Sequence, residues 1–202
     1  MDKGSREIEL KLHVRDLDAV RQRLDALGAE LVQPRVLERN NRYDDFKGSL
    51  SGTGDVLRLR QDTRTRLTFK QGRDRARVGD AISRFEAEVD VSDFDTMDTI
   101  LQQLGFRTYM VYEKYRTTYQ LDGVEVVLDE MPYGNFVEIE GDGDAIQQAR
   151  ERLGLQAAQA YQSGYTELFR RVREQLGLRF TDLTFENFTN IDVPDGAFDD
   201  RV

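Results

Sequence analysis

The sequence predicts an α+β fold, an eight-stranded antiparallel closed β-barrel with helices packed on the outside. Two observations predict it. Charged and apolar residues alternate in about eight short segments, and Arg, Lys, Asp and Glu all recur regularly at the charged positions, with little Ser, Thr or Gln. Because successive residues of a strand point to opposite faces, each segment has one charged and one apolar face. Closing such a sheet with its apolar face outward, beneath helices, produces a tunnel lined by charge.

The first strand carries the clearest pattern. In the segment 6–14, Glu7, Glu9 and Lys11 alternate with isoleucine and leucine. A half-buried strand with its charges in water alternates in the same way, so this segment alone does not distinguish a solvated sheet face from a charged tunnel. Recurrence along the chain favours the tunnel, together with a further strand over 37–44. The other charged sets are Arg58 and Arg60; Arg66 and Lys70; Arg84, Glu86, Glu88 and Asp90; Lys114 and Arg116; Asp129; and Glu138 and Glu140.

Two predicted helices follow strands at equivalent places. Asp16 can cap a helix whose apolar residues recur at helical spacing up to Gly28. Asp93 stands in the same position before a second helix that ends at Gly105. The two units match at a constant offset of 77 residues. The chain is therefore predicted to consist of two related halves, each a strand, a helix and a set of strands.

The C-terminal part is predicted to add two helices, over 144–153 and 156–176, which cover the outer apolar face. They complete a tunnel domain over residues 1–176. Residues 177–202 form an acidic, phenylalanine-containing tail, which we expect to be loosely docked or partly disordered. A docked extension, a cap over one tunnel end and a partner segment are the alternatives.

Composition excludes several classes of function. The chain has 202 residues and a net charge of −9, which makes nonspecific nucleic-acid binding a poor fit. Without cysteine, and with His13 as the single histidine, any metal must be held by oxygen, as Mg²⁺, Mn²⁺ or Ca²⁺ are. His13 shares the face of Lys11, where a supporting or solvated role is favoured over catalysis. No apolar run is long enough to span a bilayer, and the N-terminus does not have the apolar region of a signal peptide. We therefore expect a cytoplasmic protein.

Five further segments follow the Glu7-Ile-Glu-Leu-Lys11 motif, namely 57–60, 67–70, 112–116, 128–141 and 163–168. In this succession the chain resembles the CYTH family, or triphosphate tunnel metalloenzymes, over roughly residues 5 to 170. That family includes class IV adenylyl cyclases, thiamine triphosphatases and inorganic triphosphatases. The chain departs from the family pattern at Arg42 and at Asp45–Phe46. These departures concern substrate contacts at one end of the tunnel and leave the triphosphate site unaffected.

The resemblance implies a tunnel that binds a triphosphate together with Mg²⁺ or Mn²⁺. By matching position, the phosphate-binding residues are Lys11, Arg58, Arg60, Lys70, Lys114 and Arg116. The metal-binding residues, acting directly or through water, are Glu7, Glu9, Asp129, Glu138 and Glu140. The catalytic residues are Glu7, Glu9 and Lys11. Two further carboxylates, Glu86 and Glu88, match acidic residues of the family's lumen.

Two reactions fit one such tunnel. We favour a divalent-metal-dependent hydrolase of inorganic, nucleoside or thiamine triphosphate, because hydrolysis needs only the tunnel, the metal and water. The alternative is a class IV adenylyl cyclase that converts ATP to cyclic AMP and pyrophosphate, and it would need an adenine pocket that the sequence does not reveal. A non-catalytic phosphate-binding module would be expected to lack the metal-binding carboxylates, which are present. The expected partner is the small-molecule triphosphate; a homodimer is left open.

Overall fold

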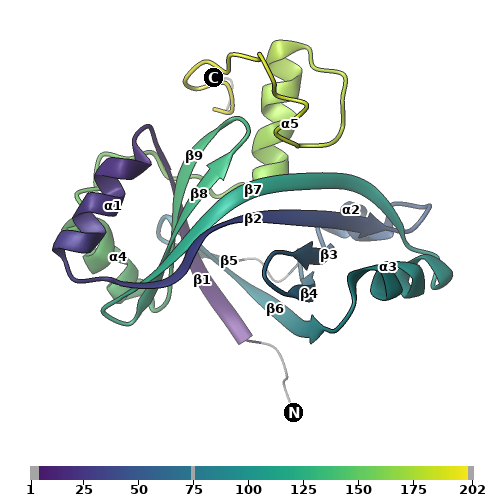
Figure 1. Cartoon of the computed structure of the whole chain (residues 1–202), viewed down its shortest axis with the longest axis horizontal. Helices are drawn as coiled ribbons and strands as arrows, with labels where there is room; N and C mark the ends of the chain where they lie inside the picture. Colours follow the sequence, from purple (N-terminus) through teal and green to yellow (C-terminus); the bar gives the residue numbers. More distant parts are fainter. Residues whose placement is uncertain (1–4, 74–75, 200–202) are drawn as a thin grey trace.

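The computed structural model describes residues 5–73 and 76–199, apart from the side chains of residues 5–7 and 78. Nine strands and five helices are found in this part of the chain (Figure 1). In chain order the elements are β1 (Ser5–Val14), α1 (Leu17–Ala26), β2 (Glu30–Asp44), α2 (Ser49–Thr53), β3 (Val56–Gln61), β4 (Thr65–Lys70), β5 (Ala76–Val78), β6 (Ala81–Val91), α3 (Phe94–Gln103), β7 (Arg107–Leu121), β8 (Val124–Met131), β9 (Gly134–Glu140), α4 (Gly143–Arg152) and α5 (Tyr165–Leu176).

Eight of the strands form a closed antiparallel ring. The strand order is β1-β9-β8-β7-β2-β3-β4-β6-β5, and an additional pairing between β1 and β6 joins the two sides. The three-residue β5 pairs with the start of β6 and lies outside this ring of eight. The predicted closed sheet with external helices is therefore confirmed, with β5 as a short addition that the sequence pattern did not indicate.

The two predicted halves are visible in the element bounds. Helices α1 and α3 are displaced by 77 residues at both ends, and so are the long strands β2 and β7. Asp16 accepts hydrogen bonds from the backbone N–H groups of Asp18 (2.9 Å) and Ala19 (3.0 Å), and Asp93 accepts one from Thr96 (2.7 Å). In the ring, β1 pairs with β6 and β2 pairs with β7, and these two pairings join two half-sheets, each of which contains the first strand of the other sequence half. The two half-sheets are β1-β9-β8-β7 and β2-β3-β4-β6.

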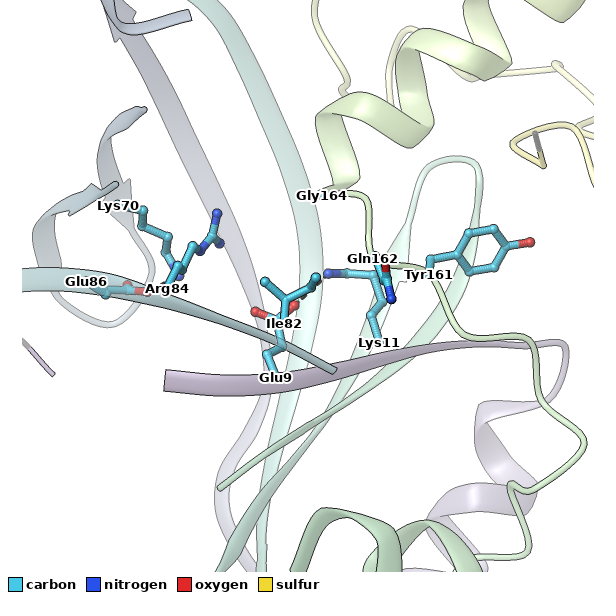
Figure 2. Close-up of a pocket in the computed structure, with 9 residues that line it drawn as sticks. All are labelled: Glu9, Lys11, Lys70, Ile82, Arg84, Glu86, Tyr161, Gln162 and Gly164. Atoms are coloured by element: carbon cyan, nitrogen blue, oxygen red, sulfur yellow. Dashed lines mark hydrogen bonds and ion pairs between the residues drawn. The ribbon is translucent and has the colours of Figure 1, made fainter. Parts of the chain in front are cut away.

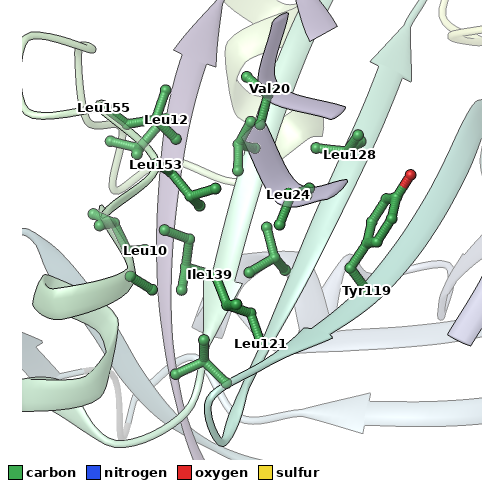
Figure 3. Close-up of a cluster of buried hydrophobic side chains, with 14 of the residues drawn as sticks. Leu10, Leu12, Val20, Leu24, Tyr119, Leu121, Leu128, Ile139, Leu153 and Leu155 are labelled. Atoms are coloured by element: carbon green, nitrogen blue, oxygen red, sulfur yellow. The ribbon is translucent and has the colours of Figure 1, made fainter. Parts of the chain in front are cut away.

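The main apolar core lies outside the ring. Leu10 and Leu12 of β1 are fully buried beneath α1 and α4, alongside Ile139 of β9 and Leu128 of β8 (Figure 3). Helix α3 covers the other half-sheet in the same way, with Leu101 packed in a cluster with strand residues. Because the strands turn their apolar faces to these helices, their charged faces must point into the ring. No helix of the described residues is long and apolar enough to cross a bilayer.

The segment preceding α5 differs from the prediction. Helix α4 matches its predicted range within one residue, but α5 begins at Tyr165, so the predicted helix over 156–176 is wrong in its first part. His13 donates its backbone N–H to Gln159 O (3.0 Å), and Tyr161 donates its own to Lys11 O (2.9 Å). These bonds satisfy the edge of β1 beyond the point where β6 leaves it. An extended segment can pair with that edge, and a helix cannot.

The C-terminal tail is packed on the body of the protein. Leu183 donates its backbone N–H to Val111 O (2.9 Å) and accepts from Glu113 N (2.8 Å), which ties the tail to β7. Phe188 and Phe198 are buried in an aromatic cluster shared with α5 and β9. The expectation of a loosely docked tail is therefore wrong for the part up to residue 199, and the docked-extension alternative describes it. The division into a domain over 1–176 and a tail over 177–202 stays a prediction.

Removing a tail phenylalanine should destabilise the whole protein. Phe198 is 1% exposed, and we expect Phe198→Ala to lower the free energy of unfolding by about 3 kcal/mol through the cavity it leaves. Phe46 is 82% exposed, so Phe46→Ala should change this free energy by less than about 0.5 kcal/mol. Urea unfolding followed by circular dichroism measures both. Equal effects of the two substitutions would contradict the packed tail.

Candidate functional site

The interior of the ring contains a charged cavity of 760 Å³. Among the described residues that line it, ten are Arg or Lys and seven are Glu. The chain as a whole carries −9, so positive charge is concentrated in the tunnel. The predicted site residues that line this cavity are Glu9, Lys11, Arg58, Arg60, Lys70, Lys114, Arg116, Glu138 and Glu140. The predicted charged lumen is thus present.

Strand register explains why these side chains meet. Directly paired residues of neighbouring strands share a face of the sheet. Lys11 of β1 pairs with Glu138 of β9, and Lys70 of β4 pairs with Glu86 of β6. Residues far apart in the sequence are therefore brought together by strand pairing, with no loop needed to place them.

Basic side chains are crowded on one side of the cavity. Arg58 and Arg60 are both more than nine-tenths buried. Burial, followed by the positive charge of Arg58, lowers the pKa of Arg60. Burial and the neighbouring Arg84 and Arg58 also lower the pKa of Lys70, although Lys70 contacts Glu86. A lowered pKa on a cation means that its charge is incompletely compensated, so an anion bound here would be stabilised.

Figure 2 shows the edge of this basic group. Lys70, Arg84 and Glu86 lie together on the side formed by β4 and β6, and Lys11 lies across from them on β1. Gly164, which precedes α5, borders the same pocket. The pocket is thus enclosed by three strands and by the start of α5.

Buried ion pairs occupy the middle of the tunnel wall. Lys11 Nζ lies 2.6 Å from Glu9 Oε1 and 3.0 Å from Glu138 Oε1. Burial alone would lower the pKa of Lys11, but Glu9 and Glu138 raise it above its ordinary value. Arg116 donates to Glu138 (2.5 Å) and to Asp129 (2.6 Å). The ammonium of Lys11 is therefore held in its charged form between two carboxylates.

Asp129 differs from the other predicted metal ligands. It is fully buried, and it accepts hydrogen bonds from Lys114 Nζ (2.9 Å), Arg116 and Tyr165 Oη (2.8 Å). These donors surround its carboxylate, which is not among the groups lining the cavity. The geometry favours Asp129 as the counter-ion that fixes Lys114 and Arg116.

Carboxylates gather on the opposite side of the cavity. Glu140 of β9 pairs in register with Glu9 of β1 and with Glu125 of β8. Burial, and next the charge of Glu9, raises the pKa of Glu140 to about 7. A carboxylate with a raised pKa is stabilised in its charged form by a nearby cation. The side chain of Glu7, predicted to act with Glu9, lies outside the described part of the structure.

This carboxylate row fits a hard metal ion that also takes substrate oxygens. Among the side chains that the structure describes, which exclude that of Glu7, no three acidic or histidine groups converge closely enough to hold an ion alone. Mg²⁺ keeps several waters and is usually bound by one or two carboxylates plus phosphate oxygens. Glu9 and Glu140 supply two carboxylates, which cannot complete a coordination shell by themselves. They therefore match the preference of Mg²⁺ for a few carboxylates with water and phosphate oxygens.

The sequence reasoning missed two residues of the site. Glu38 of β2 is fully buried, with Oε1 3.4 Å from Arg60 Nε and 3.6 Å from Lys114 Nζ. Its alternation with Asn40 and Arg42 was a usable signal, because those three share the inner face. The centroid of the Tyr165 ring lies 4.5 Å from Lys11 Nζ, and the motif at 163–168 was the available signal for this residue, although it does not indicate the contact itself.

His13 belongs to the aromatic cluster. Its ring lies 4.8 Å from that of Phe198 and 5.4 Å from that of Phe136, centroid to centroid. Burial lowers its pKa. His13 is not among the residues that line the cavity, so the supporting role expected for it is one of packing.

Comparisons with known proteins agree with this geometry. Residues 5–165 match the family model of the CYTH domain. An adenylate cyclase CyaB from Aeromonas hydrophila is 29% identical over 178 residues, which cover 82% of this chain and 89% of that protein.

Solved structures show the same fold. A protein from Vibrio parahaemolyticus, named as a candidate adenylate cyclase, superimposes with a TM-score of 0.68 at 20% identity, covering 83% of this chain and 99% of that one. A candidate adenylyl cyclase from Hippeastrum, stated to have a dominant triphosphatase activity, superimposes with a TM-score of 0.61 at 20% identity, covering 81% and 95%. At these identities the likeness is one of fold.

The raised pKa of Glu140 predicts a pH-dependent stability. Its folded pKa is about 7 against an ordinary 4.5, so between these pH values the folded protein retains a proton that the unfolded chain has lost. The free energy of unfolding therefore falls as pH rises through this window. In metal-free buffer, Glu140→Gln should match the parent at pH 5 and exceed it by roughly 2 kcal/mol at pH 8.

Urea unfolding with EDTA at the two pH values measures this difference. Glu174→Gln provides the control, because Glu174 pairs with Arg170 on the exposed side of α5. This control should show the same small difference at both pH values. A Glu140→Gln effect that is also independent of pH would contradict the assignment.

Proposed function

This chain belongs to the CYTH domain family, and we propose that it is a divalent-metal-dependent hydrolase of a triphosphate bound in the charged tunnel. One observation carries the proposal. Incompletely compensated cations, among them Arg60 and Lys70, face the same cavity as a carboxylate row that includes Glu9 and Glu140. A polyanion together with a metal cation would neutralise both sides at once.

The basic residues would hold the phosphate oxygens. A triphosphate carries about four negative charges, and arginine offers planar paired donors to such oxygens. Arg58 NH1 donates to Tyr112 Oη (3.0 Å) and NH2 to Thr68 Oγ1 (3.3 Å). These neutral partners orient the guanidinium, and its ion pair with Glu88 is loose, with 3.9 Å between NH2 and Oε2. Phosphate oxygens could therefore replace Glu88 as the partner of Arg58.

The carboxylates Glu9 and Glu140 would hold the metal ion, with Glu7 and Glu138 as the further predicted ligands. When bound, Mg²⁺ or Mn²⁺ polarises phosphate oxygens and lowers the pKa of bound water. Glu138 accepts from Arg116 and lies 3.0 Å from Lys11 Nζ. Its carboxylate therefore connects the metal-binding side of the tunnel with the phosphate-binding side.

Lys11 would stabilise charge on the reacting phosphate. Its pKa is raised by Glu9 and Glu138, so it stays protonated at neutral pH and is not a general base. A fixed ammonium beside a phosphate is an electrostatic stabiliser of charge that develops in the transition state. The ring of Tyr165 beneath Nζ helps to fix its position.

Adenylate cyclisation is the second candidate, favoured by the name of the Aeromonas hydrophila relative. This reaction needs a flat apolar surface for adenine. Among the described residues that line the cavity, the aromatic ones are Tyr112 and Tyr165. Both are more than nine-tenths buried, and their hydroxyls are bonded to Arg58 and Asp129. Neither offers a free face to a base, so hydrolysis remains the better match.

Product analysis distinguishes the two reactions. Purified protein with Mg²⁺ or Mn²⁺ is incubated in parallel with inorganic triphosphate, ATP and thiamine triphosphate. We expect phosphate release and no cyclic AMP, measured by ion chromatography. Formation of cyclic AMP from ATP would contradict the hydrolase proposal and support the cyclase. If no substrate is turned over, a phosphate-binding module is favoured.

Removing one metal-binding carboxylate should abolish turnover while the fold persists. The side chain of Glu9 is 25% exposed and pairs with Lys11. Glu9→Gln should lower kcat by roughly 100-fold or more, because an amide is a weak ligand for Mg²⁺. Glu174→Gln on α5 should retain parental activity. Undiminished activity of Glu9→Gln would place the metal elsewhere.

A further inference from the structure

Glu38 is a buried carboxylate to which the mechanism above gives no role. It lies on β2, fully shielded from solvent. Its oxygens are 3.4 Å from Arg60 Nε, 3.6 Å from Lys114 Nζ and 3.9 Å from Arg116 Nε. Three of the predicted phosphate-binding cations therefore converge on one carboxylate that does not itself line the cavity.

The contacts of Glu38 are mainly electrostatic. Asn40 donates one hydrogen bond to Oε1 (2.9 Å), whereas Oε2 has no hydrogen-bond partner. Burial alone would raise the pKa of Glu38, but Arg60, Lys114 and Arg116 hold it well below its usual range. Glu38 is thus a permanent negative charge behind the phosphate-binding residues.

The three cations depend on Glu38 to different degrees. Lys114 and Arg116 also bind Asp129 at 2.9 Å and 2.6 Å. Arg60, by contrast, forms its ion pair with Glu38 alone among the described residues, and its Nε has no hydrogen-bond acceptor. Arg60 is therefore the cation whose charge Glu38 balances when the tunnel is empty.

We propose that Glu38 is a positioning residue that acts as an internal counter-anion, holding Arg60 in the empty tunnel and limiting the affinity for phosphate so that the product can leave. This inference rests on the proposed triphosphatase function. It assigns a role in turnover to a residue that touches neither the substrate nor the metal.

The physical reason is that the negative charge of Glu38 attracts the cations of the empty tunnel but repels phosphates bound to those cations. In the empty tunnel, Glu38 reduces repulsion among buried cations that water does not screen. With phosphates bound to the same cations, its negative charge repels them at short range. The charge therefore stabilises the empty site and destabilises the occupied one, which favours release of the charged products.

Glu38→Gln separates the charge of this residue from its shape, because the amide keeps an acceptor oxygen for Asn40 and Arg60. The probes are inorganic triphosphate and diphosphate in EDTA, where no turnover occurs, titrated by calorimetry. We expect both dissociation constants to fall by about tenfold, as loss of a buried repulsion predicts. With Mg²⁺, KM and kcat for triphosphate should fall together, because the product is held longer.

A thermal measurement provides an independent readout. Without ligand, Glu38→Gln should melt below the parent protein, and saturating triphosphate should narrow the gap, because the ligand supplies the missing negative charge. Asp44→Asn is the matched control. Asp44 is a buried carboxylate on the same strand that accepts from the backbone of Leu50 and Ser51, away from the cavity. Its melting deficit should not change with ligand, and its affinity should stay within about twofold of the parent.

The outcomes are distinct. Weaker or unchanged triphosphate binding by folded Glu38→Gln overturns the counter-anion role, whereas failure of the parent protein to hydrolyse any triphosphate with Mg²⁺ or Mn²⁺ overturns the proposed function instead. If Glu38→Gln does not fold, Glu38→Asp decides, because its shorter side chain keeps the charge but withdraws it from the cations. That variant should bind triphosphate about twofold more tightly, and weaker binding contradicts the inference.

Discussion

A charge enclosed by the ring of strands has little water to solvate it, so every ion in the tunnel depends on a partner. The middle of the tunnel wall meets this requirement internally. Lys11, Arg116, Asp129 and Glu138 form a connected set of ion pairs. The sides of the cavity do not, because Arg60 and Lys70 are crowded by like charges and Glu140 is crowded by Glu9. The cavity thus has uncompensated positive charge on one side and crowded negative charge on the other, and the metal–triphosphate complex that we propose as its ligand would neutralise both.

The internal repeat produces this separation of charge. In the ring, β3 and β4 occupy the places in one half-sheet that β8 and β9 occupy in the other. The first pair contributes Arg58, Arg60 and Lys70, and the second contributes Glu138 and Glu140. Closing two such halves against each other sets the basic residues of β3 and β4 opposite the carboxylates of β9. One scaffold, used twice with different inner residues, would therefore form both the phosphate-binding and the metal-binding surface that we propose.

The elements outside the ring are connected to the site through aromatic packing. Tyr133 donates its hydroxyl to the backbone oxygen of Tyr165, and Tyr165 donates its own to Asp129. Phe198 of the tail packs against Tyr133 and Phe136 in the same cluster. The tail thus supports the side chain of α5 that contacts Lys11. Loss of tail packing would loosen the site from behind, at a distance from any phosphate.

The sequence by itself determined the closed sheet, the two capped helices at an offset of 77 residues, and most of the charged lumen, because side-chain alternation and helix caps are local properties. Tertiary structure decided the rest. Residues 159–161 are extended and not helical because they pair with an edge of β1 that β6 leaves free. Asp129 does not line the cavity because Lys114, Arg116 and Tyr165 surround its carboxylate. Glu38 of β2 lies near three cations because β2 pairs with β3 on one side and with the distant strand β7 on the other. Whether a charge is compensated depends on neighbours across the strand register, and periodicity along one strand does not contain that information.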